Sequence, residues 1–308
     1  MMCGAGTGRA YALLLLILFP AGAAAQAVVL KKKFIEESRN RVSIQAEFLV
    51  DDYSAIHSIS DNGKDGDIHV GGRSRQVGLP LVAEIVNARE NPQKAPVRRV
   101  RAKKGGQVTM TGVWRLWFEH PPKKGEKQIQ KLKLSPPADS NPDNVYEIHP
   151  VTHVDEFAVL DSFRPIPGFR AYDAEQAFGK YKDLRLTVKA NKTTVVLVST
   201  KVGYNYADFI IDLRQKPWPV PGGWMALADI LDAEENPVET RGPVRIVFVE
   251  GTAPANAVKD KVKGYRLHLL GMPRVNLDKV WAVVPEAAQP KEMWLPYEMI
   301  AVAVVTPP

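Results

Sequence analysis

Apolar and polar residues alternate in short runs along most of the chain, a pattern typical of half-buried β-strands. Segments rich in Gly, Pro, Asn and Asp separate these runs and favour turns. The predicted strands are residues 42–50, 66–70, 81–88, 107–118, 145–151, 184–190, 193–200, 206–212, 224–231, 244–251, 265–271 and 279–284. Helical periodicity is limited to residues 173–181 and 255–264. The pattern therefore predicts an all-β protein with few short helices.

An internal similarity divides these strands into two sets. Residues 81–92, LVAEIVNARENP, align with residues 226–237, ALADILDAEENP. Each copy is followed by a strand that begins with valine and carries an arginine, at residues 113–118 and 244–249. Such repetition predicts two copies of one β unit. A chance similarity between two strand-plus-turn segments is the alternative explanation.

The number of strands per unit, five or so, suits a small closed barrel or a compact sandwich. We predict two tandem OB-like β-barrels or compact sandwiches, an N-terminal domain at residues 26–160 and a C-terminal domain, a degenerate repeat, at residues 169–308. A Pro-rich stretch, residues 161–168, is the predicted linker. The chain of 308 residues accommodates two domains of about 120 residues each.

The first 25 residues have the features of a secretory signal peptide. Arg9 precedes an apolar run at residues 12–19, and a proline then leads into small residues that end at Ala25. A bilayer is spanned by about 20 apolar residues, and this run is shorter. We therefore predict cleavage after Ala25, no remaining transmembrane segment, and a periplasmic or secreted protein, with an uncleaved anchor as the alternative. The single cysteine, Cys3, would leave with the signal, so neither a disulfide nor a thiol ligand is expected.

The net charge of +7 is concentrated in two basic runs that flank a strand with two tryptophans. Aromatic rings beside basic loops can bind an anionic polymer or envelope surface by stacking and charge pairing. Alternatively, the rings fill a β core and the basic loops keep the protein soluble. The candidate contacts are Arg98, Arg99, Arg101, Lys123, Lys124, Lys127, Trp114 and Trp117.

Histidines and acids form the most specific chemical pattern in the chain. Residues two apart in a strand share a face, so Asp67 lies beside His69, and Glu147 lies beside His149. If their strands are neighbours, these side chains converge and can hold zinc or another divalent transition ion, or act as an acid/base pair. The alternative is a ladder of opposite charges that only stabilises the sheet. The candidate metal ligands are His69, His149, Asp67, Glu84, Glu147 and His120.

The second copy of the repeat lacks these histidines. Ile210 takes the place of His69, and the predicted strand at residues 279–284 holds Trp281 and no histidine. Chemistry based on histidine is therefore expected only in the first domain.

The order of these motifs resembles a group of small secreted bacterial β-barrel domains that are similar to the OB-fold and mostly uncharacterised. In that group, strands with the patterns D-x-H, E-I, G-V ending in a histidine, and I-E-L-H-P-V follow one another. Here Asp67 to His69, Glu84-Ile85, Gly112-Val113 with His120, and Glu147 to Val151 occupy those places. The resemblance covers about the first half of the mature chain and departs from the group in a longer basic insert. It implies a fold and a secreted compartment, but no reaction.

Two functions are consistent with these patterns. From the sequence we favour a secreted binding or scaffold module for an anionic partner in the cell envelope, such as a polysaccharide, a lipid surface or a nucleic acid. The alternative is a metal-dependent, nuclease-like hydrolase that uses the histidine and acid cluster. The sequence leaves open whether the protein is an enzyme and suggests no cofactor beyond a divalent metal. Convergence of the candidate ligand atoms within about 5 Å would favour a metal site over a charge ladder.

Overall fold

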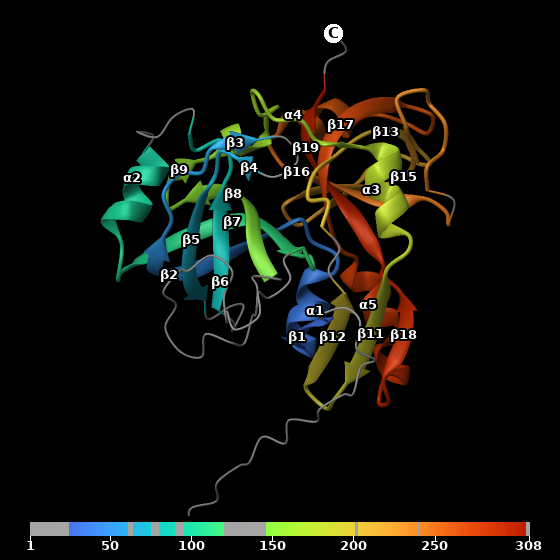
Figure 1. Ribbon diagram of the computed structural model, residues 1–308, viewed down its shortest axis with the longest axis horizontal. Coiled ribbons are helices and arrows are strands. Elements are labelled where there is room, and N and C mark those ends of the chain that lie inside the picture. Colours follow the sequence, from blue (N-terminus) through green and yellow to red (C-terminus); the bar gives the residue numbers. More distant parts are fainter. Residues whose placement is uncertain are drawn as a thin grey trace, which may run out of the picture.

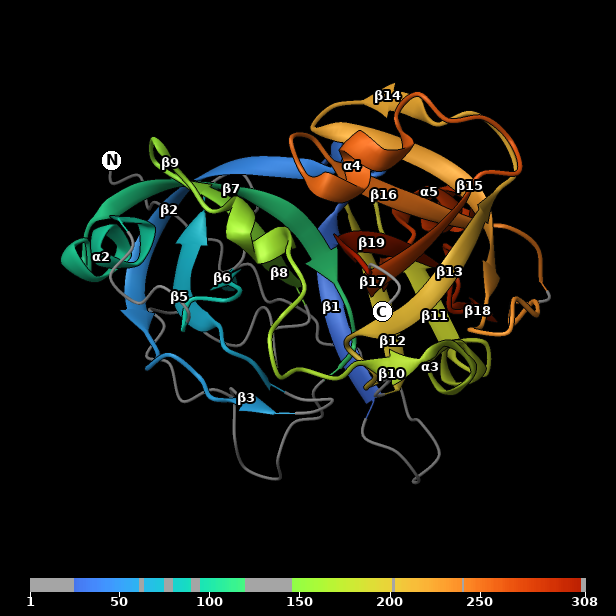
Figure 2. The ribbon, with the colours of Figure 1, turned by 90° about the horizontal axis from the view of Figure 1, so that it is seen from above.

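The computed structural model describes residues 25–60, 64–74, 80–89, 95–119, 146–200, 203–239 and 241–305. The described chain forms two closed five-stranded β-barrels and a separate four-stranded sheet (Figure 1). The barrels lie side by side when seen from above (Figure 2). The predicted all-β class with two tandem small barrels is confirmed. No helix among the described residues is long and apolar enough to cross a membrane.

The first barrel closes in the strand order β2-β5-β6-β8-β7, with β7 pairing back to β2. All neighbouring strands in this barrel pair antiparallel, except β6 and β8, which pair parallel. A helix, α2, connects the third and fourth strands. The elements are β2 (Ser43–Tyr53), β5 (Ile68–Ser74), β6 (Pro80–Ile85), α2 (Ala95–Ala102), β7 (Gln107–Leu116) and β8 (Tyr146–Val154).

The second barrel repeats this topology. Its order is β13-β15-β16-β19-β17, β16 and β19 are its parallel pair, and the helix α4 again connects the third and fourth strands. A five-stranded barrel with this order and connection is OB-like. The elements are β13 (Ala207–Leu213), β15 (Gly223–Leu231), β16 (Val244–Val249), α4 (Ala253–Val258), β17 (Arg266–Val275) and β19 (Tyr297–Val304).

The topology corrects the register of the internal repeat. Residues 81–85 lie in β6, the third strand of the first barrel in chain order. Residues 226–231 lie in β15, the second strand of the second barrel. Both segments are strands that run into a turn, so they share local structure but occupy different positions in the two barrels. Matched by strand order, β7 corresponds to β17 and β8 to β19, so Tyr146-Glu147 corresponds to Tyr297-Glu298.

The third sheet was not predicted from the sequence. It joins segments that are far apart in the chain, in the order β1-β12-β11-β18. The strand β1 falls within the range predicted for the first barrel, but it pairs with β12 instead. The strands are β1 (Ala25–Lys31), β11 (Arg185–Ala190), β12 (Thr194–Thr200) and β18 (Lys291–Trp294).

Helices account for a second difference. Residues 279–284, predicted as a strand, belong to α5 (Leu277–Val283) and the 3-10 turn η3 (Val284–Glu286). The side chain of Asn276 accepts hydrogen bonds from the first backbone amides of α5 and so caps its start. The predicted helix at residues 173–181 corresponds to α3 (Ala174–Tyr181). The remaining elements are α1 (Lys32–Ser38), β3 (Ile59–Ser60), β4 (Lys64–Asp65), β9 (Phe157–Ala158), η2 (Leu160–Phe163), β10 (Tyr172–Asp173) and β14 (Trp218–Val220).

Two buried arginines join the barrels reciprocally. Arg115 Nε on β7 donates to the carbonyl of Pro273, 3.1 Å away on β17. Arg274 on β17 donates through Nη1 to the carbonyl of Trp114, 3.0 Å away on β7. Because β7 and β17 are corresponding strands, the barrels contact each other with an approximate two-fold relation. This contact fixes the outer face of the first barrel against the second half of the chain.

Candidate metal centre

The histidines and acids lie on the outer face of the first barrel. Ile68 and Ile148 belong to the hydrophobic core. Since side chains alternate along a strand, the adjoining residues His69, Glu147 and His149 point to the opposite face. All three are buried, so this face is covered in the folded chain.

An inner group consists of Glu84, Glu147 and His149. The parallel pairing of β6 with β8 places their side chains next to one another. His149 Nδ1 lies 3.0 Å from Glu84 Oε2 and 3.3 Å from Glu147 Oε2. One ligand atom from each residue lies within 4.8 Å of the others. No residue of this inner group is more than 4% exposed.

An outer group consists of His57, Asp67 and His69. His57 Nδ1 lies 2.8 Å from Asp67 Oδ1, and His69 Nε2 contacts the other carboxylate oxygen, Oδ2. Their ligand atoms also lie within 4.8 Å of one another. The side chain of His57 is 35% exposed, so this group is the part of the cluster nearest to solvent.

The second half of the chain completes the cluster. Tyr206, the residue before β13, donates its hydroxyl to Asp65 Oδ2 at 2.6 Å. The same carboxylate oxygen lies 3.8 Å from His149 Nε2, opposite the nitrogen that faces the inner group. Asp65 and Tyr206 can therefore hold the imidazole in the orientation that presents Nδ1 to a metal.

Among the described residues, the cluster holds more acidic side chains than basic ones. Arg115 donates through Nη1 to Glu147 at 2.9 Å and through Nη2 to Glu119 at 2.6 Å. With all acids ionised, even three protonated imidazoles and this guanidinium do not balance the carboxylates. Uncompensated charge is costly in a buried environment, so the cluster favours an added cation. The buried carboxylates of this part of the chain are Asp65, Asp67, Glu84, Glu119 and Glu147.

The titration of these groups shows where a cation would compete with protons. Burial lowers the pKa of His149, but Glu84, Asp65 and Glu147 outweigh it and raise that pKa to about 10. Burial likewise opposes protonation of His69, whose pKa is raised to about 8, mainly by Asp67. Burial raises the pKa of Glu84 well above its ordinary value. In the absence of a metal, the raised pKa values of His149, His69 and Glu84 favour protons on the same groups that would bind a cation.

The second barrel provides an internal control. When the strands of the two barrels are matched by order and pairing register, three positions of the cluster have different residues in the second barrel. There His69 is replaced by Met225, Glu84 by Val247 and His149 by Ile300. The three replacements are apolar and buried. The same OB-like fold therefore forms without this polar cluster.

The two corresponding glutamates differ in their partners. Glu298 binds Arg274 Nε through Oε1 at 2.6 Å and Arg245 through Oε2. Val82 stands at the position of Arg245 in the first barrel. Among the described residues, the buried Oε1 of Glu147 has no hydrogen-bond partner. One carboxylate oxygen is thus left available in the inner group.

The structure brings five of the six candidate ligands close together. Asp67 and His69 join the outer group, and Glu84, Glu147 and His149 form the inner group. The sixth candidate, His120, lies outside the described residues.

Three residues of the cluster were not predicted from the sequence: His57, Asp65 and Tyr206. His57 lies in an irregular segment after β2, and Tyr206 comes from the second half of the chain. Only the closeness of Asp65 to the Asp67 and His69 motif offered a signal.

The two tryptophans predicted to contact an anionic partner do not lie on an exposed surface. Trp114 and Trp117 are buried, and their indoles donate to the carbonyls of Arg41 and Gly203, at 3.0 and 3.3 Å. Their rings fill the core rather than face solvent, which corrects the stacking hypothesis.

The first basic run also differs from its expected loop. Arg98, Arg99 and Arg101 lie on α2, where Arg98 is exposed and Arg99 pairs with Asp155 at 2.5 Å. The lysines Lys123, Lys124 and Lys127 lie outside the described residues. An anionic partner therefore stays a prediction.

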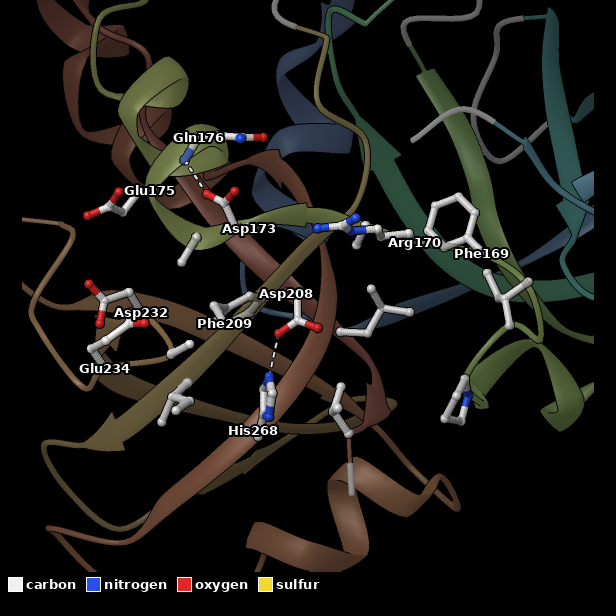
Figure 3. Close-up of a pocket in the computed structure, with 18 residues that line it drawn as sticks. Phe169, Arg170, Asp173, Glu175, Gln176, Asp208, Phe209, Asp232, Glu234 and His268 are labelled. Atoms are coloured by element: carbon white, nitrogen blue, oxygen red, sulfur yellow. Dashed lines mark hydrogen bonds and ion pairs between the residues drawn. The ribbon is translucent and has the colours of Figure 1, made fainter. Parts of the chain in front are cut away.

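A separate pocket of about 830 Å³ lies against the second barrel (Figure 3). Asp208 on β13 pairs with His268 on β17 at its wall, and Asp173 caps the start of α3 at its edge. None of the residues that line it belongs to the histidine and acid cluster.

No protein-family model matches the chain, and no curated protein matches it. The geometry of the cluster is therefore the basis for the function proposed below.

Proposed function

We propose that the first barrel binds a divalent transition metal ion, with Zn²⁺ as the probe of choice, through Glu84, Glu147 and His149. The comparison between the barrels carries this proposal. The second barrel has the same topology and fills the positions of Glu84 and His149 with Val247 and Ile300. Burying acids and imidazoles is costly, so their presence in only one barrel favours a function other than folding.

The donor set suits such an ion. Carboxylate oxygen and imidazole nitrogen are ordinary ligands of zinc, and three protein ligands leave a fourth position for water or another group. A simple charge ladder would pair acids with bases, whereas among the described residues acids outnumber bases in the cluster and one oxygen of Glu147 has no hydrogen-bond partner. The burial of Glu84, Glu147 and His149 favours an ion that is held in the fold over a reaction that a substrate must reach.

Elemental analysis tests this proposal directly. The protein purified without chelators, or stripped and then dialysed against Zn²⁺, is expected to retain the metal in stoichiometric amount and to unfold at a higher temperature. His268→Ala, which removes a histidine of the second barrel outside the cluster, is the matched control and should retain it. A stripped protein that takes up no Zn²⁺, and no other first-row divalent ion, would refute the proposal.

Metal binding is also expected to release protons near pH 7.5. His149 has a pKa near 10 and is protonated at this pH, so an ion that binds Nδ1 must displace about one proton. Apparent affinity should therefore rise with pH up to about 10 and weaken as the pH falls. Titration calorimetry in buffers of different ionisation enthalpy measures the proton count. Heats that are independent of the buffer would contradict binding at His149.

A further inference from the structure

We infer that the cluster is a two-ion centre, in which His57, Asp67 and His69 hold a second divalent cation and Glu84 bridges it to the first. This inference rests on the proposed function, because the inner group supplies one of the two ions. It adds a site with its own ligands and its own access to solvent.

The position of the Glu84 carboxylate is the main observation. Its Oε2 lies 3.0 Å from His149 Nδ1 in the inner group, and its Oε1 lies 3.3 Å from His69 Nε2 in the outer group. Each oxygen thus faces an imidazole nitrogen of a different group. In two-metal sites the ions are about 3.5–4 Å apart, a spacing that a bidentate carboxylate can bridge.

The outer group has a complete donor set of its own. Asp67 presents one oxygen to His57 Nδ1 and the other to His69 Nε2. The two imidazole rings also meet edge to face, with centroids 4.4 Å apart. Two imidazoles and a carboxylate form a donor set used by zinc and by non-haem iron.

The two groups differ in their access to solvent. The ligands of the inner group are at most 4% exposed, whereas the side chain of His57 is 35% exposed. The outer ion should therefore exchange faster and be removed first by a chelator.

The experiment compares Zn²⁺ and Co²⁺ binding to the full chain and to three variants. The unmodified protein is expected to bind two ions per chain. His57→Ala, at a partly exposed position outside the barrel strands, should lose the faster-exchanging ion and retain the other. His149→Ala should lose the tighter ion. His153→Ala, on the same strand as His149 but outside both groups, is the control and should bind two.

The outcomes separate this inference from the proposed function. If the unmodified protein binds one ion per chain and His57→Ala still binds one, the second site is refuted and the inner site stands. Uptake of no ion would overturn both. With two Co²⁺ bound, electron paramagnetic resonance should show coupled ions, and Glu84→Gln should weaken that coupling. Two uncoupled ions would refute the bridging role of Glu84.

Discussion

Replacing Arg115 with methionine is expected to lower the free energy of unfolding of the metal-free protein by about 3–5 kcal/mol. The guanidinium is 1% exposed and is the partner of two buried acids, Glu119 and Glu147. Methionine fills similar space but removes the cation that contacts both carboxylates. It also removes the hydrogen bond to the carbonyl of Pro273 in the second barrel. Chemical denaturation in the presence of a chelator measures the loss.

The control for this prediction is a solvent-exposed ion pair. Arg214 pairs with Asp229, and its side chain is 55% exposed. Arg214→Met should leave the free energy of unfolding nearly unchanged because surface pairs contribute little. If Arg115→Met costs no more than this control, the buried acids do not need the arginine. In a double-mutant cycle, adding Glu147→Gln to Arg115→Met should recover part of the loss.

The strand content of the barrels was predictable because it depends on local alternation. Residues 107–118 alternate as a half-buried strand should, and β7 forms there. The same rule placed Glu147 and His149 on one face. The strand predicted at residues 279–284 is a helix because Asn276 caps its start and tertiary packing buries Leu277 and Val280. The third sheet joins β1 to strands more than 150 residues away, and local pattern carries no such information.

The cluster was predictable only in part, for a related reason. A spacing of two residues within a strand predicts that Asp67 and His69 share a face, but it does not show which strands are neighbours. His57 and Tyr206 enter through tertiary contacts that no periodicity reports. The contrast between Val82 and Arg245 becomes visible only after strands are matched by their order in the barrel.

Replacing Glu84 with valine and His149 with isoleucine together copies the second barrel into the first. The double variant is expected to bind no metal at the inner group, because two of its three ligands are gone. It should nevertheless fold and, with chelator present, be as stable as the unmodified protein or more stable by about 1–4 kcal/mol. Replacing buried charged groups by apolar residues is often neutral or stabilising, and Val247 and Ile300 are buried in an apolar cluster at the corresponding positions.

This double replacement distinguishes a metal site from a charge ladder because the remaining charges keep their partners. Glu147 retains Arg115, and Asp65 retains Tyr206. If Glu84 and His149 serve only to stabilise the sheet, removing both should destabilise the metal-free protein, and Zn²⁺ should have no effect on either form. If they serve to hold an ion, the unmodified protein should gain stability from Zn²⁺ and the double variant should not, as thermal unfolding with and without the metal would show.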